Sequence, residues 1–259
     1  MPASPVAWTV PAAPPLPRPY RIRPPGVAGR VCRDRYAGTH ASVATNAGVV
    51  FDIDGTLLDT NYLHVLAWWQ AFRDNDHPVS MWTLHRAIGI GSEELVQRVL
   101  GHPDDDVVQA HSERYEPLRD QVTAFPRAAE LLSACADRGL TVVLATSGAK
   151  DDLDWMLPAI GVADGVIAGT TTSADVDAAK PHPDLLQFAV RDHGLDPART
   201  VAVGDTVWDI EAAQGAGLPC VALLAGGIGR DELRDAVAVY DDPAALLDAL
   251  DSSPLGTLR

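Results

Sequence analysis

From residue 48 onward the sequence alternates short, mostly apolar runs with amphipathic stretches. Apolar runs of about four to eight residues are typical of strands buried on both faces, and apolar positions three or four apart indicate helices between them. The runs are GVVFDI (48–53), LTVVLAT (140–146), GVIAG (165–169), TVAVGD (200–205), CVALL (220–224) and AVAVY (236–240). This pattern predicts an α/β fold, a Rossmann-like parallel sheet sandwiched by helices.

One interval breaks the alternation. Residues 61–124 contain no strand-like run, and they hold only helical pieces such as NYLHVLAWWQAFRD (61–74). In open α/β sheets ligands bind beyond the carboxyl ends of the strands, so a helical segment inserted after the first strand would cover that site. We therefore expect an α/β catalytic core of residues 46–60 and 125–259 with an all-helical cap of residues 61–124.

Residues 1–45 differ from the rest in composition, because they are rich in proline and hold six arginines against one acid. Proline removes backbone donors and fixes the backbone, so this composition predicts a disordered leader. The leader could be a basic interaction tail, an arginine-rich targeting segment or an extension upstream of the true start codon. A dispensable extension is the interpretation we favour.

The formal net charge is −15 at pH 7 although the leader is basic, so the remainder of the chain is strongly acidic. An acidic body argues against binding nucleic acid, which rests on neutralising phosphates with lysine and arginine. A small phosphorylated metabolite stays open as a partner, since one local cation can outweigh a distant charge. No run approaches the roughly 18 apolar residues of a membrane span. The three cysteines (Cys32, Cys135, Cys220) fit neither disulfides nor a zinc site, so we expect a cytoplasmic protein. We expect it to be a monomer or a homodimer.

Two carboxylates end the first apolar run. Asp52 and Asp54 lie two positions apart, so on a strand both side chains would address the same site. An Asp-Gly turn carrying a solvated acid explains such a pair as well. Other predicted strand ends favour a site, because they bring further acids, hydroxyls and one lysine to the same edge: Thr146, Ser147, Lys180, Asp205 and Asp209. Convergent carboxylates repel one another unless a cation lies among them, and hard oxygen ligands suit Mg²⁺.

Four stretches in order, DIDGT, LATSG, AAKPHPD and VGDTVWDIEAA, resemble the four motifs of the haloacid dehalogenase-like hydrolase superfamily. The resemblance covers about residues 49–250, and GVVFDIDGTLLDTNYLHVLAWW is similar to the capped branch that contains phosphoglycolate phosphatase and β-phosphoglucomutase. The dehalogenases lack the second acid, so Asp54 argues against their chemistry. The resemblance implies a Mg²⁺-dependent phosphatase that hydrolyses a small phosphomonoester through an aspartyl phosphate. A phosphomutase and a non-catalytic binding protein are the alternatives.

The same resemblance implies a role for each acid. Asp52 would be the nucleophile and a metal ligand. Asp54 would be the general acid and base, with its main-chain carbonyl on Mg²⁺. Asp205 would bind the metal directly, and Asp209 would bind it through water or brace the site.

Five further residues are candidates for contact with the substrate. By resemblance, Thr146 would hydrogen-bond the transferring phosphoryl group, with Ser147 beside it, and Lys180 would neutralise its charge. His64 faces either the substrate or a packed core, because most of its helix is apolar. Ser92 stands where β-phosphoglucomutase has a cap arginine that clamps a second phosphate. A neutral hydroxyl there favours water over a sugar as the acceptor.

Overall fold

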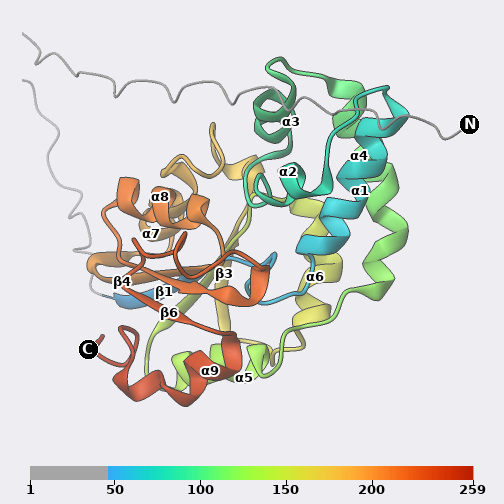
Figure 1. Ribbon diagram of the computed structural model, residues 1–259. Helices are drawn as coiled ribbons and strands as arrows, with labels where there is room; N and C mark the ends of the chain where they lie inside the picture. Colours follow the sequence, from blue (N-terminus) through green and yellow to red (C-terminus); the bar gives the residue numbers. More distant parts are fainter. Residues whose placement is uncertain (1–45, 259) are drawn as a thin grey trace, which may run out of the picture. The chain divides into compact units, whose positions relative to one another are not determined.

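The computed structural model describes residues 46–258, so the predicted leader (1–45) lies outside the described residues. Six strands of the described chain form one sheet in the order β3-β2-β1-β4-β5-β6, and every neighbouring pair is parallel. The strands are β1 (Asn46–Phe51), β2 (Thr141–Ala145), β3 (Ile167–Thr171), β4 (Leu195–Gly204), β5 (Cys220–Leu223) and β6 (Ala238–Tyr240). Each overlaps one predicted apolar run, and helices cover the sheet, which confirms the predicted fold class (Figure 1).

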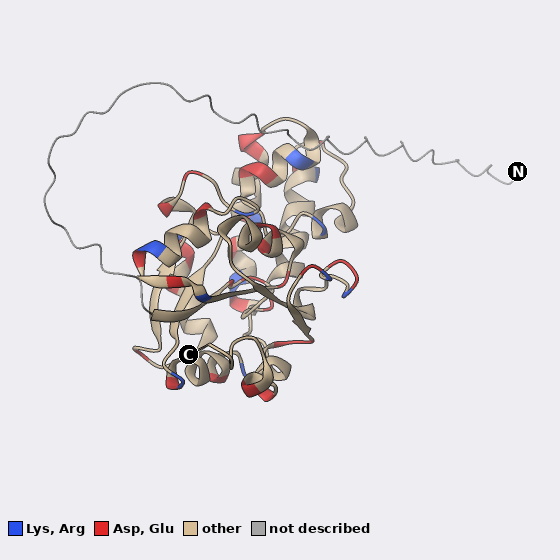
Figure 2. Cartoon of the chain, turned by 90° about the vertical axis from the view of Figure 1, so that its left-hand side faces the viewer, with Lys and Arg blue, Asp and Glu red and all other residues tan. Residues whose placement is uncertain are grey.

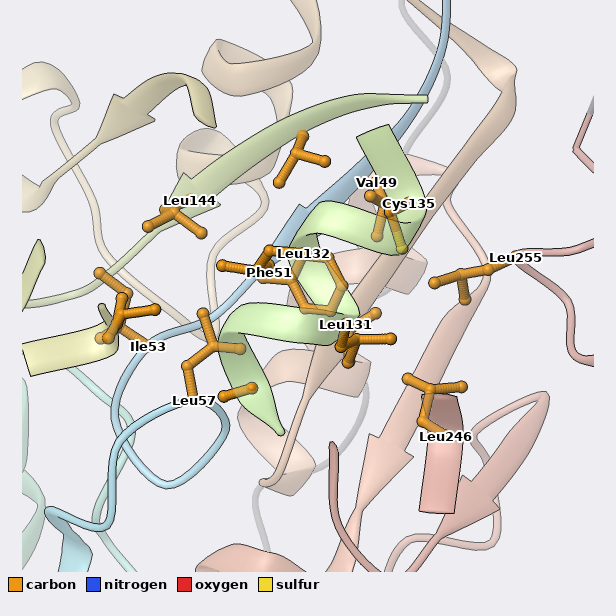
Figure 3. Close-up of a cluster of buried hydrophobic side chains, with 14 of the residues drawn as sticks. Val49, Phe51, Ile53, Leu57, Leu131, Leu132, Cys135, Leu144, Leu246 and Leu255 are labelled. Carbon is orange, nitrogen blue, oxygen red and sulfur yellow. The ribbon is translucent and has the colours of Figure 1, made fainter. Parts of the chain in front are cut away.

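Alternation along each central strand sends side chains to both faces of the sheet. In β1, Val49 and Phe51 enter one buried cluster and Val50 enters another. The first cluster is covered by α5 (Ala128–Asp137), α6 (Leu153–Ile160) and α9 (Pro243–Asp248), and the second by α7 (Asp184–Asp192) and α8 (Val207–Ala216). Figure 3 shows Val49 and Phe51 near Leu131 and Leu132 of α5. Both faces of the sheet are therefore buried under helices, which explains why near-continuous apolar runs identified the strands.

The register brings the carboxyl ends of three strands to one level. Phe51 at the end of β1 lies opposite Leu144 of β2 and Val203 of β4. The residues that follow these strands are therefore neighbours in space. Four 3₁₀ helices lie in or after the connections of the core, namely η2 (Lys150–Asp152), η3 (Ser173–Asp175), η4 (Leu224–Gly226) and η5 (Leu250–Ser252).

Between β1 and α5 the chain forms a set of helices that we call the helical insertion (residues 61–121). Its elements are α1 (Asn61–Asp74), α2 (Met81–His85), α3 (Ser92–Leu100), α4 (Asp105–Tyr115) and η1 (Glu116–Gln121). They enclose a third apolar cluster that includes Trp68, Phe72 and Leu84, and Trp208 of α8 also enters it. The insertion is therefore docked on α8, while the division of the chain into core and cap at residues 60 and 125 stays a prediction.

Acidic residues outnumber basic residues in this chain. Figure 2 shows acidic positions over much of the fold, with less numerous basic positions scattered among them. Cys135 and Cys220 are buried and unpaired, so they act as small apolar side chains in the core. Among the helices of residues 46–258, none combines the length and apolar character that crossing a membrane requires.

Candidate active site

Three carboxylates meet beyond the carboxyl ends of β1 and β4. Asp52 follows β1, Asp205 follows β4, and Asp209 lies in the first turn of α8. One oxygen of each lies within 4.8 Å of the others, and all three side chains are buried. In the part of the chain that the structure describes, these three form the one group of potential metal ligands gathered this closely.

Lys180 supplies a positive charge to this cluster. Its ammonium forms an ion pair with Asp52 and a second one with Asp209, whose Oδ1 lies 2.7 Å from Nζ. Burial opposes the charge on Lys180, but Asp209 and Asp52 outweigh that effect and raise its pKa above the ordinary value. The lysine is therefore charged, and its single positive charge can balance only one of the three carboxylates when all three are ionised.

Asp205 is held by two neutral donors. The Thr56 hydroxyl donates a hydrogen bond to Oδ1 at 3.0 Å, and the Asn61 amide donates one to Oδ2 at 2.8 Å. Burial raises the pKa of Asp205 well above its ordinary value, and the charges of Asp209 and Asp52 add to the shift. Burial also raises the pKa of Asp52 to about 7, although Lys180 opposes the change. Ionising this cluster therefore costs free energy, which a divalent cation among the oxygens would offset.

Asp209 is fixed by the start of its own helix. The backbone N–H and the hydroxyl of Thr206 both donate to its Oδ2, at 3.0 and 2.6 Å, and Thr206 Oγ1 accepts from its backbone N–H at 3.3 Å. This capping box leaves Oδ1 free to meet Lys180. A side chain at Gly204 would place its Cβ 2.2 Å from the Cγ of Asp209, so the strand can end beside the carboxylate only as glycine.

Asp54 turns to a different set of partners from those of Asp52. Its Oδ1 accepts a hydrogen bond from the Thr60 hydroxyl at 2.8 Å and lies 3.4 Å from Nε2 of His64. Its Oδ2 accepts a hydrogen bond from the Thr146 hydroxyl at 3.3 Å. Burial opposes ionisation of Asp54, but its hydrogen bonds with His64 and Thr60 outweigh this effect and lower the pKa of Asp54. Asp52 and Asp54 thus line the same pocket, but their carboxylates have different partners.

A pocket of about 70 Å³ lies where the strand ends meet the helical insertion. The core side of its wall is polar and consists of Asp52, Asp54, Thr146, Ser147 and Gly148. The insertion contributes an aromatic and aliphatic wall with three polar side chains, consisting of His64, Trp68, Ile88, Gly89, Ile90, Ser92, Leu95 and His111. Of the residues predicted to contact substrate, all but Lys180 line this pocket, and Lys180 lies behind Asp52 in an ion pair. A pocket of this volume suits a small ligand.

Two of the predicted substrate residues also contact protein groups of the insertion. The Ser147 hydroxyl donates a hydrogen bond to the Gly89 carbonyl at 3.2 Å. His64 Nδ1 lies 3.3 Å from Nε2 of His111, and the His64 ring stacks on Tyr115 with centroids 3.8 Å apart. His64 therefore faces the pocket and packed aromatic rings at once, which combines the two interpretations that the sequence left open.

Sequence reasoning assigned no role to three residues that hold the site carboxylates. Thr56 hydrogen-bonds Asp205, Thr60 hydrogen-bonds Asp54, and Asn61 hydrogen-bonds Asp205. The two threonines stand within ten residues of Asp52, so their hydroxyls were a usable signal. Asn61 is separated from Asp205 by 144 positions, and a contact over such a distance leaves no local pattern.

The chain is similar to known proteins over the part that holds these motifs. The family model described as haloacid dehalogenase-like hydrolase matches residues 47–217. A phosphoglycolate phosphatase from Yersinia pseudotuberculosis is 33% identical over 196 residues, which cover 69% of this chain and 81% of that relative. A solved structure of a hydrolase from Pseudomonas syringae aligns with a TM-score of 0.75 and 34% identity, over 80% of this chain and 99% of that one. A β-phosphoglucomutase from Clostridium difficile shares the fold, with a TM-score of 0.67 and 19% identity over 77% of this chain and 92% of that structure.

Proposed function

Because this chain belongs to the haloacid dehalogenase-like hydrolase family, we propose that it is a Mg²⁺-dependent phosphatase that hydrolyses a small phosphomonoester. The observation that carries the proposal is the buried cluster of Asp52, Asp205 and Asp209, in which Lys180 pairs with Asp52 and Asp209 and Asp52 lines a small pocket. The phosphatase relative adds a substrate class, since phosphoglycolate is itself a small phosphomonoester.

The residues present fit a divalent cation. Asp52, Asp205 and Asp209 offer hard carboxylate oxygens within 4.8 Å of one another, and Lys180 neutralises only part of their charge. Oxygen ligands of this kind, with few carboxylates and room for phosphate oxygens, are what Mg²⁺ takes in phosphoryl-transfer sites. Bound there, the ion would neutralise charge on the transferring phosphoryl group. Asp54 would contribute only its main-chain carbonyl to the metal site, because its carboxylate accepts hydrogen bonds from Thr60 and Thr146.

In the proposed first step, a carboxylate oxygen of Asp52 attacks phosphorus and the bond from phosphorus to the leaving oxygen breaks. The product is an aspartyl phosphate, and the leaving alkoxide takes a proton from Asp54 to become an alcohol. Lys180 and the Thr146 hydroxyl stabilise the charge that develops on the phosphoryl oxygens. Asp54 must be protonated for this step, and the anionic phosphoryl group beside it would raise its pKa in the complex.

In the second step, water attacks phosphorus and Asp54 takes a proton from that water. The bond from phosphorus to Asp52 then breaks, which releases inorganic phosphate and regenerates the carboxylate. The ionised form of Asp54 that this step needs is the form favoured by its contacts with His64 and Thr60.

A screen for phosphate release tests the proposed function. We expect small phosphomonoesters to yield inorganic phosphate with Mg²⁺ and to yield at least about tenfold less with EDTA, because the buried carboxylates then repel the substrate. We also expect negligible conversion of β-glucose 1-phosphate to glucose 6-phosphate, even with a bisphosphate primer. Ser92 offers the pocket a neutral hydroxyl, and a mutase needs a second phosphate clamp there. Isomerisation that outpaces phosphate release would favour a phosphomutase.

The loop after β5 provides a test of the metal site that does not depend on activity. A Cβ at Gly226 would lie 1.7 Å from Oδ2 of Asp205 and 2.7 Å from Nδ2 of Asn61, and Asp205 is fully buried and cannot retreat into solvent. We therefore expect Gly226→Ala to lose the rise in melting temperature that millimolar Mg²⁺ gives the wild type. A ligand that binds only the folded state at 100 times its Kd stabilises by about 2.7 kcal/mol.

Gly229→Ala is the matched control, because its Cβ would meet nothing nearer than Oε1 of Glu232 at 3.8 Å. Thermal melts of both variants with EDTA and with Mg²⁺ give the comparison. A Gly226→Ala protein whose Mg²⁺-dependent shift equals that of Gly229→Ala would place the metal elsewhere.

A further inference from the structure

The ring of His64 is held from three sides. Its Nε2 lies 3.4 Å from Oδ1 of Asp54, and its Nδ1 lies 3.3 Å from Nε2 of His111. Its face stacks on Tyr115 at 3.8 Å with an interplanar angle of 11°. His111 and Tyr115 are four positions apart on α4, hence on one face of that helix, so a single element fixes both the plane and one edge of the ring.

His111 is itself fixed and neutral. It is 7% exposed, and its ring stacks on Trp68 at 3.8 Å with an interplanar angle of 10°. Burial holds the pKa of His111 well below its ordinary value, and the positive charge of Arg119 acts in the same direction. A neutral imidazole carries one N–H and one bare nitrogen, so its contact with His64 has a defined donor and acceptor.

The direction of the two hydrogen bonds follows from Asp54. An ionised carboxylate only accepts, so the His64 nitrogen facing Asp54 must carry a proton. With Nε2 protonated, a neutral His64 presents a bare Nδ1 to His111, and His111 must then donate from its Nε2. Both contacts are satisfied by two neutral rings in this one arrangement. The hydrogen bond at one imidazole nitrogen thereby sets the state of the other.

We infer that His111 is a positioning residue, whose Nε2–H fixes the tautomer and orientation of His64 so that His64 donates to Asp54. The inference rests on the proposed function, in which Asp54 is the acid and base of the reaction. His111 acts through His64, so its loss should lower kcat and leave KM nearly unchanged. General acid–base groups contribute about 10²–10⁴-fold to rate, and a residue that only orients such a group carries a part of that, about tenfold.

Three substitutions at His111 separate positioning from packing. Phe keeps a ring against Trp68 and loses the donor. Gln loses the ring but places an amide N–H near the position of Nε2, and Asn places its amide near the position of Nδ1. We expect His111→Phe and His111→Asn to lower kcat about tenfold, with KM within about twofold, and His111→Gln to recover most of the loss. A packing role predicts the opposite order, with Phe the most active and Gln and Asn equal.

His77→Phe is the control, because His77 also pairs with an acid of the insertion, Asp104 at 3.1 Å, but lies outside the pocket lining. Its kcat should equal that of the wild type. A fully active His111→Phe enzyme, or equal losses in the Gln and Asn variants, would overturn the inference.

A spectroscopic measurement tests the same inference in the wild-type protein without any activity. Long-range ¹H–¹⁵N spectra distinguish protonated from bare imidazole nitrogens. We expect a protonated Nε2 and a bare Nδ1 on His64, and a protonated Nε2 on His111. A His111 ring protonated at Nδ1 alone would overturn the inference, whatever the enzyme hydrolyses. If phosphate release is absent while the spectra agree, the proposed function fails and the orientation of His64 by His111 stands.

Discussion

The Asp52→Asn variant is expected to fold like the wild type and to release phosphate at least about 10³-fold more slowly. The amide has the shape of the carboxylate but cannot act as the attacking oxygen. Its oxygen can still accept from Lys180, which also keeps its ion pair with Asp209. Loss of one negative charge from a crowded cluster should leave the melting temperature unchanged or higher, because Asp52 and Asp205 repel each other in the folded protein.

Phosphate release under saturating substrate and Mg²⁺ measures this effect, and Asp164→Asn at an exposed position is the control. Acid quenching of the wild type during turnover should also trap a phosphoryl group on the protein that hydroxylamine removes. Residual turnover of Asp52→Asn within tenfold of the wild type would rule out the covalent route and transfer the attack to water.

The Lys180→Met variant is expected to be the most destabilised single substitution of the site. Lys180 is 2% exposed and is the ion-pair partner of both Asp52 and Asp209. Breaking a buried ion pair by removing one partner typically costs about 3–5 kcal/mol, because the remaining charge stays buried without compensation. Urea unfolding in EDTA measures the loss, and Mg²⁺ should restore part of it by supplying positive charge to the same oxygens.

Lys150→Met is the natural control, since the chain has two lysines and Lys150 is exposed. Substitution there should change the free energy of unfolding by no more than about 0.5 kcal/mol. If Lys180→Met were as stable as this control, the carboxylates around Lys180 would have to hold protons in the folded protein, and their pairing with the lysine would contribute little.

The strands could be predicted where both faces of the sheet are buried, and less well where they are not. The runs of β2 and β5 are apolar at nearly every position, and their limits agree with the structure to within one residue, whereas β1 begins and ends two residues before its run. β3 is an edge strand, and it continues through Thr170 and Thr171 after the apolar run has ended. β4 begins at Leu195, well before its apolar run, because Leu195 pairs with Asn46 ahead of a register shift.

The site could be predicted as far as its charges stand directly at strand ends. Asp52 and Asp205 are of this kind, because charged residues beside apolar runs are conspicuous. Lys180 lies in the connection before α7, and the stretch AAKPHPD indicated it rather than a strand end. The environment of Asp54 could not be predicted, since it is set by His64 and by hydroxyls whose orientation depends on the loop between β1 and α1. The pairing of His64 with a histidine 47 positions away depends on how α4 packs against α1, and local spacing carries no signal for that contact.

Because Lys180 is buried and Lys150 is exposed, a dye can be attached selectively to one of the two lysine side chains. Acylating dyes react with exposed, deprotonated amines, and Lys180 is both enclosed and held as an ammonium by two carboxylates. Lys150 is exposed at the start of η2, two residues beyond Gly148 of the pocket wall. Since Cys135 and Cys220 are buried as well, a fluorophore coupled to side-chain amines would attach at Lys150 beside the pocket. Among the side chains of residues 46–258, Lys150 thus provides one position from which fluorescence could follow substrate entry and product release.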